Sequence, residues 1–476
     1  MSAETRFDFK KNIDRALKNR QLRNNLRSAM DGLRQKRTGV FADPEELEAL
    51  REQGHAIRKR ALSRLPELLL QLEQRCTENG IQVHWAESGA MANRIVLEIL
   101  NRHNATRLVK GKSMVSEEMH LNHFLQEHGV EALEADLGEF IIQLEGETPS
   151  HIIVPAVHKN KDEVARVFHD KIPGAPYTEE VEALNAIARR TLRQKFREGE
   201  VGLSGVNFAV AETGTLCLVE NEGNGRMCTT VPPVHIAVMG IEKVVEKLEE
   251  VPPLLRLLTG SATGQIITTY FNMITSPRKD SEKDGPREVH LILLDNGRSQ
   301  IFADPELRQT LYCIRCGTCL NHCPVYTRLG GHAYGFVYPG PIGKILTPQL
   351  EGLQAAGELA TASTLCNACE EVCPVKIPLP ALIRRMRNES YSPAPDSKVR
   401  GHGYRRNIAE TAAWKLWALM NTHPWMQRVA TRMLAFGGNL LPKIGPLQAW
   451  TRARSRPRFA RRSLHERLRS KGAEHE

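Results

Sequence analysis

The sequence contains no long hydrophobic run, and this absence argues against a membrane-spanning protein. Of its 476 residues 41% are hydrophobic and 25% are charged, yet no apolar stretch approaches the roughly 18 residues of a membrane-spanning helix. The first residues, MSAETRFDFKKN, also lack the apolar segment of a secretory signal. We therefore expect a soluble, cytoplasmic protein of about three domains, at roughly 150 residues each.

Two nucleotide-binding signatures are also missing. No G-x-G-x-x-G opens a helix after a strand, so the fingerprint of flavin and nicotinamide enzymes is absent. Gly111-Lys112-Ser113 resembles the end of a phosphate-binding loop, but Thr106 stands where that loop needs its upstream glycine. A plain helix cap is the favoured role of Ser113, and an anion at the helix N-terminus near Glu117 is the alternative.

Cysteines are few but concentrated. Seven of the ten fall between Cys313 and Cys373, and in a reducing cytoplasm such a concentration indicates metal binding rather than disulfides. The other three are scattered, and we expect them to be ordinary packing residues: Cys76, Cys217 and Cys228.

The concentrated cysteines follow the spacing of a two-cluster ferredoxin, C-x2-C-x2-C-x3-C-P and then C-x2-C-x3-C-P. In such proteins the last cysteine of each motif binds the cluster of the other motif. Zinc also accepts four thiolates, but zinc ribbons use separated C-x2-C pairs, so the spacing favours iron–sulfur clusters. The crossed rule assigns Cys313, Cys316, Cys319 and Cys373 to cluster 1, and Cys323, Cys366 and Cys369 to cluster 2.

Cluster 2 lacks one cysteine, because Ser363 stands where the first of the second motif is expected. Three alternatives remain: a three-iron cluster, a four-iron cluster with an oxygen or solvent ligand, and a ligand from elsewhere. The two motifs are separated by Pro324 to Leu365, an insert longer than in compact ferredoxins, which indicates a helical two-cluster module.

Composition and motifs divide the chain into four segments. The charge is uneven, because Asp396 to Glu476 carries 17 Lys or Arg against 5 Asp or Glu. The predicted segments are a basic helical segment (1–40), an α/β domain (41–300), a ferredoxin domain (301–388) and a basic C-terminal region (389–476).

The α/β domain alternates short apolar runs with amphipathic helices, which predicts a parallel sheet with crossover helices. A mostly helical stretch, 44–79, precedes the first run. Early strands are expected at 81–86, 106–111 and 151–157. Later apolar runs, VHIAVMG, GQIITTYFNMI and VHLILLDNG, are expected to complete the same sheet, with a helix at 241–258.

A glycine-rich stretch, residues 211–225, is a candidate ligand site. Its glycines free the backbone for close approach and its polar residues offer hydrogen-bonding groups, although turns between two strands would look the same. The residues concerned are Gly214, Gly223 and Gly225 with Glu212, Thr213, Thr215 and Asn221. We interpret three histidines beside apolar strands as structural: His151, His158 and His235.

The C-terminal region combines positive charge with Trp414, Trp417 and Trp425. No zinc finger or RNA-recognition signature accompanies the charge, so nucleic-acid binding is disfavoured. Docking on a partner or on the chain itself is favoured over contact with the inner-membrane surface, which stays the alternative.

Several blocks of the sequence, in one order, are similar to the lactate utilisation protein B family, the iron–sulfur subunit of a three-component L-lactate oxidation system. They are KGKSMVSEEMHLN, DLGEFIIQL, PSHIIVPAVHKNK, AETGTLCLVENEGNGRM and DNGRS, followed by the paired cysteine motifs. The resemblance covers nearly the whole chain. It implies an α/β domain of the LUD type, similar to sugar-isomerase and CoA-transferase folds, followed by an α-helical ferredoxin domain.

The resemblance also implies a role. Its members carry electrons while L-lactate is oxidised to pyruvate, which allows growth on lactate, together with a cysteine-rich partner and a second LUD-domain partner. The implied ligands are the same seven cysteines, and a three-cysteine second site is the family pattern. The chain would then be an electron-transfer subunit rather than a stand-alone enzyme. The alternative is an α/β domain that itself acts on a phosphorylated or acyl substrate.

Overall fold

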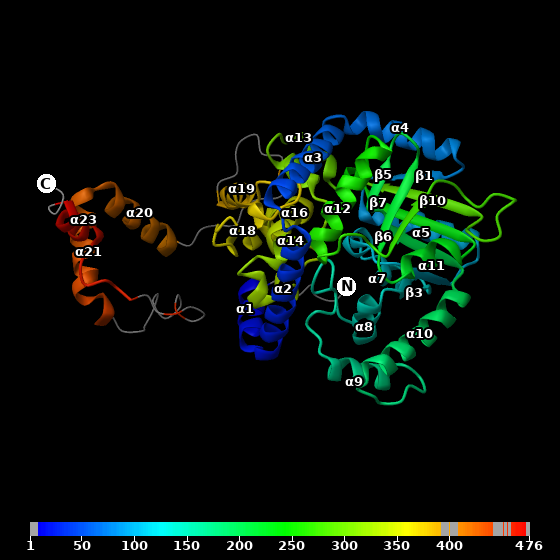
Figure 1. Cartoon of the computed structure of the whole chain (residues 1–476), viewed down its shortest axis with the longest axis horizontal. Helices are drawn as coiled ribbons and strands as arrows, with labels where there is room; N and C mark the ends of the chain where they lie inside the picture. The colour runs from blue at the N-terminus through cyan, green and yellow to red at the C-terminus, as the bar shows by residue number, and fades with distance from the viewer. Residues whose placement is uncertain are drawn as a thin grey trace. The chain divides into compact units, whose positions relative to one another are not determined.

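The computed structural model describes residues 8–391, 399, 408–440, 451, 455 and 458–472. The chain divides into two compact units, Met1–Gly403 and Tyr404–Glu476. The first unit holds both the α/β region and the cysteine-rich region, which pack against each other (Figure 1).

A six-stranded sheet lies at the centre of the first unit, in the order β1-β10-β7-β4-β2-β3. Every neighbouring pair is parallel, as the sequence predicts. All residues of the central strand β7 are buried, which is expected where other elements cover both faces of a sheet. The strands are β1 Gln82–Ala86, β10 Glu288–Leu294, β7 Val234–Gly240, β4 Val201–Gly205, β2 Arg107–Lys110 and β3 Glu131–Glu134.

Alternate residues of the strands enter different cores. Ile236 and Val238 of β7 share one core with α5 and α7, whereas Ala237 and Met239 share another with α4 and α12. This period of two is what a pleated strand covered on both faces requires. The helices of this region are α5 Gly89–Arg102, α6 Met114–Glu118, α7 Leu121–Glu127, α8 Leu137–Glu145, α9 Lys161–Lys171, α10 Val181–Glu198, α11 Asn224–Thr230 and α12 Val251–Ala262.

A second, four-stranded sheet has the order β8-β5-β6-β9, so the prediction of one sheet is wrong. The strands are β8 Val244–Val245, β5 Phe208–Val210, β6 Thr215–Glu220 and β9 Tyr270–Ile274. A hairpin turn at Gly214, with φ of 69°, reverses the chain between β5 and β6. Glycine is needed there because a Cβ would lie 2.8 Å from the carbonyl carbon of Arg75.

Two further expectations are wrong. Residues 151–157 form turns instead of a strand, because Nδ1 of His151 accepts the N–H groups of Ile153 and Val154 at 3.0 and 3.1 Å. The expected helix at 241–258 begins only at Val251. Pro252 follows, and a proline fits only the first turn of a helix.

The N-terminal helices pack against the cysteine-rich region, about 300 residues away in the sequence (Figure 1). Arg34 Nε donates to the Asn321 carbonyl at 2.7 Å, and Arg51 Nε donates to the Cys373 carbonyl at 3.0 Å. These helices therefore hold both cysteine motifs. Their bounds are α1 Phe9–Lys18, α2 Arg20–Val40 and α3 Pro44–Ser63, whereas the next helix, α4 Leu65–Glu78, contacts β1 and β8 of the α/β region.

The cysteine-rich region is built from short helices, as predicted. The insert between the two motifs contains α16, whose residues Gly340 to Leu350 are all buried. The elements are α13 Arg298–Ala303, η3 Leu307–Tyr312, α14 Thr318–Asn321, α15 Tyr326–Leu329, η4 His332–Tyr334, α16 Gly340–Glu351, α17 Leu353–Ala356, η5 Gly357–Thr361, α18 Ala368–Glu371 and α19 Leu379–Tyr391.

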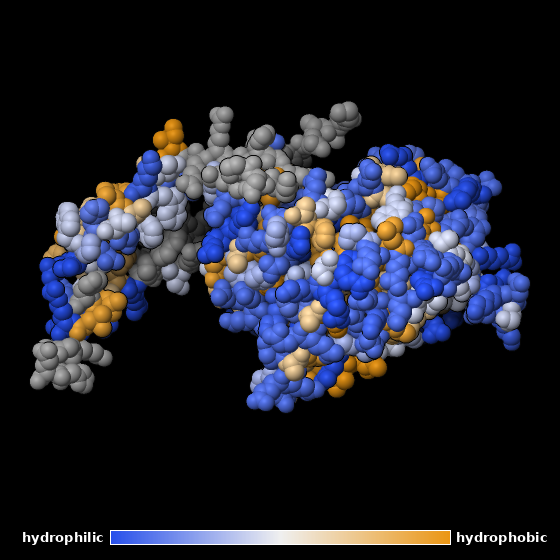
Figure 2. Space-filling view, turned by 90° about the horizontal axis from the view of Figure 1, so that it is seen from above, coloured by the Kyte–Doolittle hydropathy of each residue, from blue (hydrophilic) through white to orange (hydrophobic). Residues whose placement is uncertain are grey.

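The second unit contains α20 Ile408–Thr422, α21 Pro424–Gly437, η6 Gly438–Leu440 and α23 Leu464–Gly472. Its helices expose apolar side chains: Trp414, Trp417 and Trp425 are 55%, 57% and 64% exposed. Figure 2 shows hydrophobic surface on this unit. Throughout the described parts of the chain, no helix is both long and apolar enough to cross a bilayer.

The close packing of α11 on β4 generates a prediction. A Cβ at Gly202 would lie 1.9 Å from the carbonyl oxygen of Cys228, so Gly202→Ala must displace backbone and is expected to destabilise the fold by more than about 2 kcal/mol. Gly32, inside α2, has no atom within 4 Å of such a Cβ. Gly32→Ala is expected to stabilise the protein by up to about 1 kcal/mol. Thermal unfolding of both variants checks the contrast, and equal melting temperatures would contradict it.

Candidate iron–sulfur sites and the adjoining cavity

Four of the seven cysteines surround one small cavity, which we name pocket 1. The loop before α14 supplies two of them, α14 itself supplies the third, and the chain returns after α18 with the fourth. Apolar side chains such as Ile342 and Leu379 complete the wall. The cysteines are Cys313, Cys316, Cys319 and Cys373.

The other three cysteines surround a second cavity, pocket 2. They are Cys323, Cys366 and Cys369. Ser363 also lines this pocket, and its hydroxyl accepts the Leu365 N–H at 3.2 Å. The structure thus brings together the same two groups of cysteines that the crossed rule assigned, with Ser363 beside the smaller group.

Backbone and side-chain donors point at the sulfur atoms. The N–H groups of Arg315 and Ile377 lie 3.4 and 3.3 Å from the Sγ atoms of Cys313 and Cys373. Lys344, fully buried in α16, places its Nζ 3.6 Å from Cys323 Sγ. The sequence analysis missed Lys344, although a single lysine within the apolar run GPIGKIL was a usable signal.

Burial makes four of the seven thiols poor anions without a metal. Burial raises the pKa of Cys369 to about 12 and that of Cys373 to about 11, and it also raises the pKa of Cys316 and Cys319. Cysteine binds metal as thiolate, so a bound cation must offset this cost. Groups of four and three soft thiolate donors, with N–H groups directed at sulfur, fit iron–sulfur clusters.

A chain of buried ion pairs, here called the buried ion chain, joins the α/β region to the loop of pocket 1. Arg298 forms two hydrogen bonds of 2.8 Å to Glu118 and one of 2.6 Å to Glu242. Glu242 in turn accepts a hydrogen bond of 3.1 Å from Arg315, which lies between Cys313 and Cys316. Burial would raise the pKa of Glu242, but Arg298 and Arg315 outweigh it and lower the value to about 2.

A cavity of about 550 Å³, the sheet-edge cavity, lies beside pocket 1. Its walls come from the residues after β2 and β4, from β6, β7 and α12, and from Arg315 and Tyr338 of the cysteine-rich region. In open α/β sheets, ligands bind outside the carboxyl ends of the strands, which is the location of this cavity. The cavity and pocket 1 share two wall residues, Ile152 and Arg315.

Two cations in the cavity wall have unused hydrogen-bonding capacity. Lys243 is 7% exposed, and its ammonium makes no hydrogen bond or salt bridge to any described residue. Burial, and then the charge of Arg315, lowers the pKa of Lys243 to about 8. Nη1 of Arg315 is buried and has no hydrogen-bond partner within the described part of the chain.

The helix N-termini at the cavity are already capped. Ser113 Oγ accepts the Ser116 N–H at 3.2 Å, so the cap predicted at Ser113 is confirmed. Asp136 caps α8, and Glu220 accepts the N–H groups of Gly225 and Arg226 at 2.6 Å each. These N–H groups are therefore not free to bind a phosphate.

The glycine-rich stretch only partly reaches the cavity. Glu220, Asn221, Glu222 and Gly225 line it, whereas Glu212 accepts the Leu248 N–H elsewhere. The remaining candidates, Thr213, Gly214, Gly223 and Thr215, are not among the lining residues.

Each of the three histidines makes a side-chain hydrogen bond, as expected of a structural residue, while Nδ1 of His158 and Nδ1 of His235 have no hydrogen-bond partner among the described residues. His151 bonds Asn321 Oδ1 at 3.0 Å through Nε2. The other two contacts are His158 with Glu147 at 2.6 Å and His235 with Ser204 at 2.8 Å.

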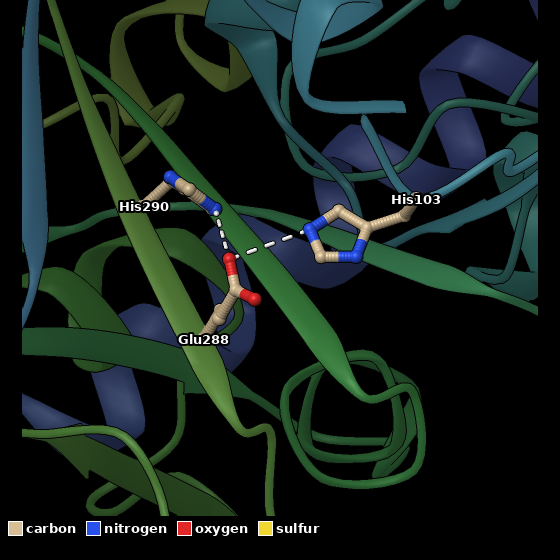
Figure 3. Close-up of side chains that lie close together, drawn as sticks. All are labelled: His103, Glu288 and His290. Carbon is tan, nitrogen blue, oxygen red and sulfur yellow. Dashed lines mark ion pairs between the residues drawn. The ribbon is translucent and has the colours of Figure 1, made fainter. Parts of the chain in front are cut away.

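Another group of side chains lies at the opposite end of β10 (Figure 3). The Nε2 atoms of His103 and His290 lie 3.3 and 3.5 Å from one oxygen of Glu288, and His84 contacts His290 at 3.1 Å. Burial, and then the charges of His84 and Arg102, lowers the pKa of His290 to about 4. Because Arg102 already supplies positive charge, a metal cation is disfavoured, and we interpret the group as a cluster of histidines held near one carboxylate by electrostatic contacts.

Family models match three parts of the chain. They describe a LUD domain over residues 69–294, a 4Fe-4S dicluster domain over 309–377, and the C-terminal part of lactate utilisation protein B over 385–473. The chain is therefore an iron–sulfur protein in which a LUD domain precedes a 4Fe-4S dicluster domain.

Curated relatives match nearly the whole chain. Lactate utilization protein B of Bacillus pumilus is 39% identical over 460 residues, covering 94% of each chain. Uncharacterized electron transport protein YkgF of Escherichia coli K12 is 40% identical over 457 residues, also covering 94% of each chain. The chain belongs to the lactate utilization protein B family.

A crystal structure of a DUF162 family protein from Deinococcus radiodurans also matches, at 15% identity. It covers 48% of this chain and 98% of that one, with a TM-score of 0.28. At that level the likeness carries no weight for fold or function.

The buried ion chain predicts a large effect of Glu242→Gln. The substitution removes the carboxylate partner of the buried Arg315 and one of the two carboxylate partners of Arg298, which is expected to cost about 3–5 kcal/mol of the free energy of unfolding. Thermal unfolding of the anaerobically purified protein measures the loss. Glu249→Gln is the matched control, since the Glu249 side chain is 76% exposed. A melting temperature equal to that of this control would refute the prediction.

Proposed function

We propose that the chain is the electron-transfer subunit of a system that oxidises L-lactate to pyruvate. The single observation that carries the proposal is the grouping of the seven cysteines into adjacent pockets of four and three. Cys313, Cys316, Cys319 and Cys373 would hold cluster 1, and Cys323, Cys366 and Cys369 would hold cluster 2. Membership of the lactate utilization protein B family supports lactate as the electron donor.

The side chains around the pockets suit this role. When bound, a 4Fe-4S cluster supplies a one-electron centre. Arg58 and Arg315 are buried and interact electrostatically with Cys313, so they offset the negative charge of bound thiolates. Oxidation of lactate to pyruvate releases two electrons, and two pockets provide two one-electron sites.

The pockets differ in their access to solvent and ligand. Pocket 1 adjoins the sheet-edge cavity through Ile152 and Arg315, whereas pocket 2 contains Cys366, the exposed member of the seven. This arrangement supports electron entry at pocket 1 and exit at pocket 2. For the fourth corner of cluster 2 we favour an oxygen ligand, because Ser363 lines the pocket and no eighth cysteine does.

The remaining subunits are proposed from the family. A cysteine-rich partner and a second LUD-domain partner would complete the system, and the exposed apolar side chains of α20 and α21 offer a surface for docking a partner.

The cluster assignment predicts different effects of two cysteine substitutions. Cys373→Ala is expected to remove cluster 1 and Cys366→Ala to remove cluster 2, each lowering the iron content by about half. Electron paramagnetic resonance of the reduced proteins identifies which signal is lost. Cys217→Ala, at a buried cysteine distant from both pockets in sequence, is expected to keep all the iron. Loss of the same signal in both pocket variants would contradict the crossed assignment.

The proposed role predicts reduction by L-lactate. The anaerobically purified chain is mixed with its two partner subunits, and L-lactate is expected to reduce the clusters whereas D-lactate serves as the control. A strain that lacks the gene is expected to lose growth on L-lactate. Clusters that stay oxidised, together with normal growth of that strain, would exclude the proposal.

A further inference from the structure

The sheet-edge cavity contains an excess of free hydrogen-bond donors. Its acidic wall residues are already bonded: Glu220 caps α11, Glu222 accepts the Leu137 N–H at 3.3 Å, and Asp136 caps α8. Glu242 is held by Arg298 and Arg315 within the buried ion chain. Lys112, the third cation of the wall, donates to the Ile153 carbonyl at 2.9 Å and pairs with Glu139 at 3.7 Å.

The free donors are the ammonium of Lys243 and the Nη1 group of Arg315. Both cations interact electrostatically with Cys313, a cysteine of pocket 1. A buried charge without a hydrogen-bond partner costs free energy of folding. An anionic ligand in the cavity would offset this cost for both Lys243 and Arg315. The two free donors therefore lie in the part of the cavity next to pocket 1.

The side chains of the cavity wall favour a carboxylate over a phosphate as the anion. Ser113, Asp136 and Glu220 each accept N–H groups at the helix N-termini beside the cavity, so those N–H groups are not available to a phosphate. A guanidinium with one free nitrogen, beside one ammonium, suits the two oxygens of a carboxylate. Apolar side chains, among them Val206 and Leu258, line the rest of the cavity and suit a short carbon chain.

We propose that the sheet-edge cavity binds a small organic acid of the 2-hydroxy or 2-oxo class, with its carboxylate on Lys243 and Arg315. The site places the acid beside pocket 1, with Arg315 belonging both to the cavity wall and to the cysteine loop. This inference rests on the proposed function only for the identity of the acid. It assigns a ligand-binding role to the LUD domain of this chain itself.

Titration calorimetry on the full, cluster-loaded chain without its partners tests the site. L-Lactate and pyruvate are the probes, and lactamide, which lacks the carboxylate charge, and inorganic phosphate are the comparisons. We expect both acids to bind and lactamide and phosphate to bind at least about tenfold more weakly, as for loss of a charged hydrogen bond. No binding of either acid, or phosphate binding as tightly as lactate, would overturn the proposal.

Substitution of Lys243 tests whether this side chain binds the carboxylate of the acid. Lys243→Met is expected to weaken binding of both acids by about tenfold to a hundredfold, and Lys243→Arg is expected to restore part of it. Lys247→Met is the control, because the Lys247 side chain is 51% exposed and lies outside the wall. The iron content of each variant shows that cluster 1 is retained. If Lys243→Met shifts only the reduction potential of cluster 1 and leaves acid binding unchanged, Lys243 is a counter-ion and the inference is wrong.

The two proposals fail in different ways. Acid binding that depends on Lys243, without reduction of the clusters in the presence of the partners, would remove the proposed function and keep this site. Reduction by L-lactate with no acid binding to the isolated chain would keep the function and place the acid site in a partner.

Discussion

The buried ion chain is the constraint on which the arrangement of this protein depends. Glu118 and Glu242 come from the α/β region, Arg298 follows β10, and Arg315 comes from the cysteine loop. A buried charge that loses its partner is strongly destabilising, so these four side chains must stay in contact. The loop that carries Cys313 and Cys316 and leads into α14 is thereby fixed against the carboxyl end of the sheet.

The cysteine-rich region depends on the rest of the first unit. Arg34 and Arg51, from the N-terminal helices, donate to carbonyls of Asn321 and Cys373. Arg58, fully buried, donates to main-chain carbonyls of both regions, including Val244 and Tyr312. Arginine suits this task because its guanidinium offers five donors in a fixed plane. Helices that precede the LUD domain in the sequence therefore hold the backbone of both pockets in place.

This construction places a ligand-sized cavity and two cysteine pockets in series. The sheet supplies the cavity at its carboxyl edge, Arg315 separates the cavity from pocket 1, and α14 leads from Cys319 of pocket 1 to Cys323 of pocket 2. Cys366 brings pocket 2 to the surface. This order agrees with the proposed entry of electrons at pocket 1 and their exit at pocket 2.

The sequence by itself determined the local chemistry. Cysteine spacing predicted which cysteines line each pocket and the gap at Ser363, and apolar periodicity predicted β1, β2, β7 and β10 but not β3 or β4 of the parallel sheet. The signals that succeeded lie within short stretches of chain. Only the tertiary structure decided what long-range contacts control. It placed β5, β6, β8 and β9 in a separate sheet, turned residues 151–157 around the His151 ring, and brought Lys243 and Arg315 to one cavity wall. Those outcomes depend on residues tens to hundreds of positions apart, whose contacts no local pattern encodes.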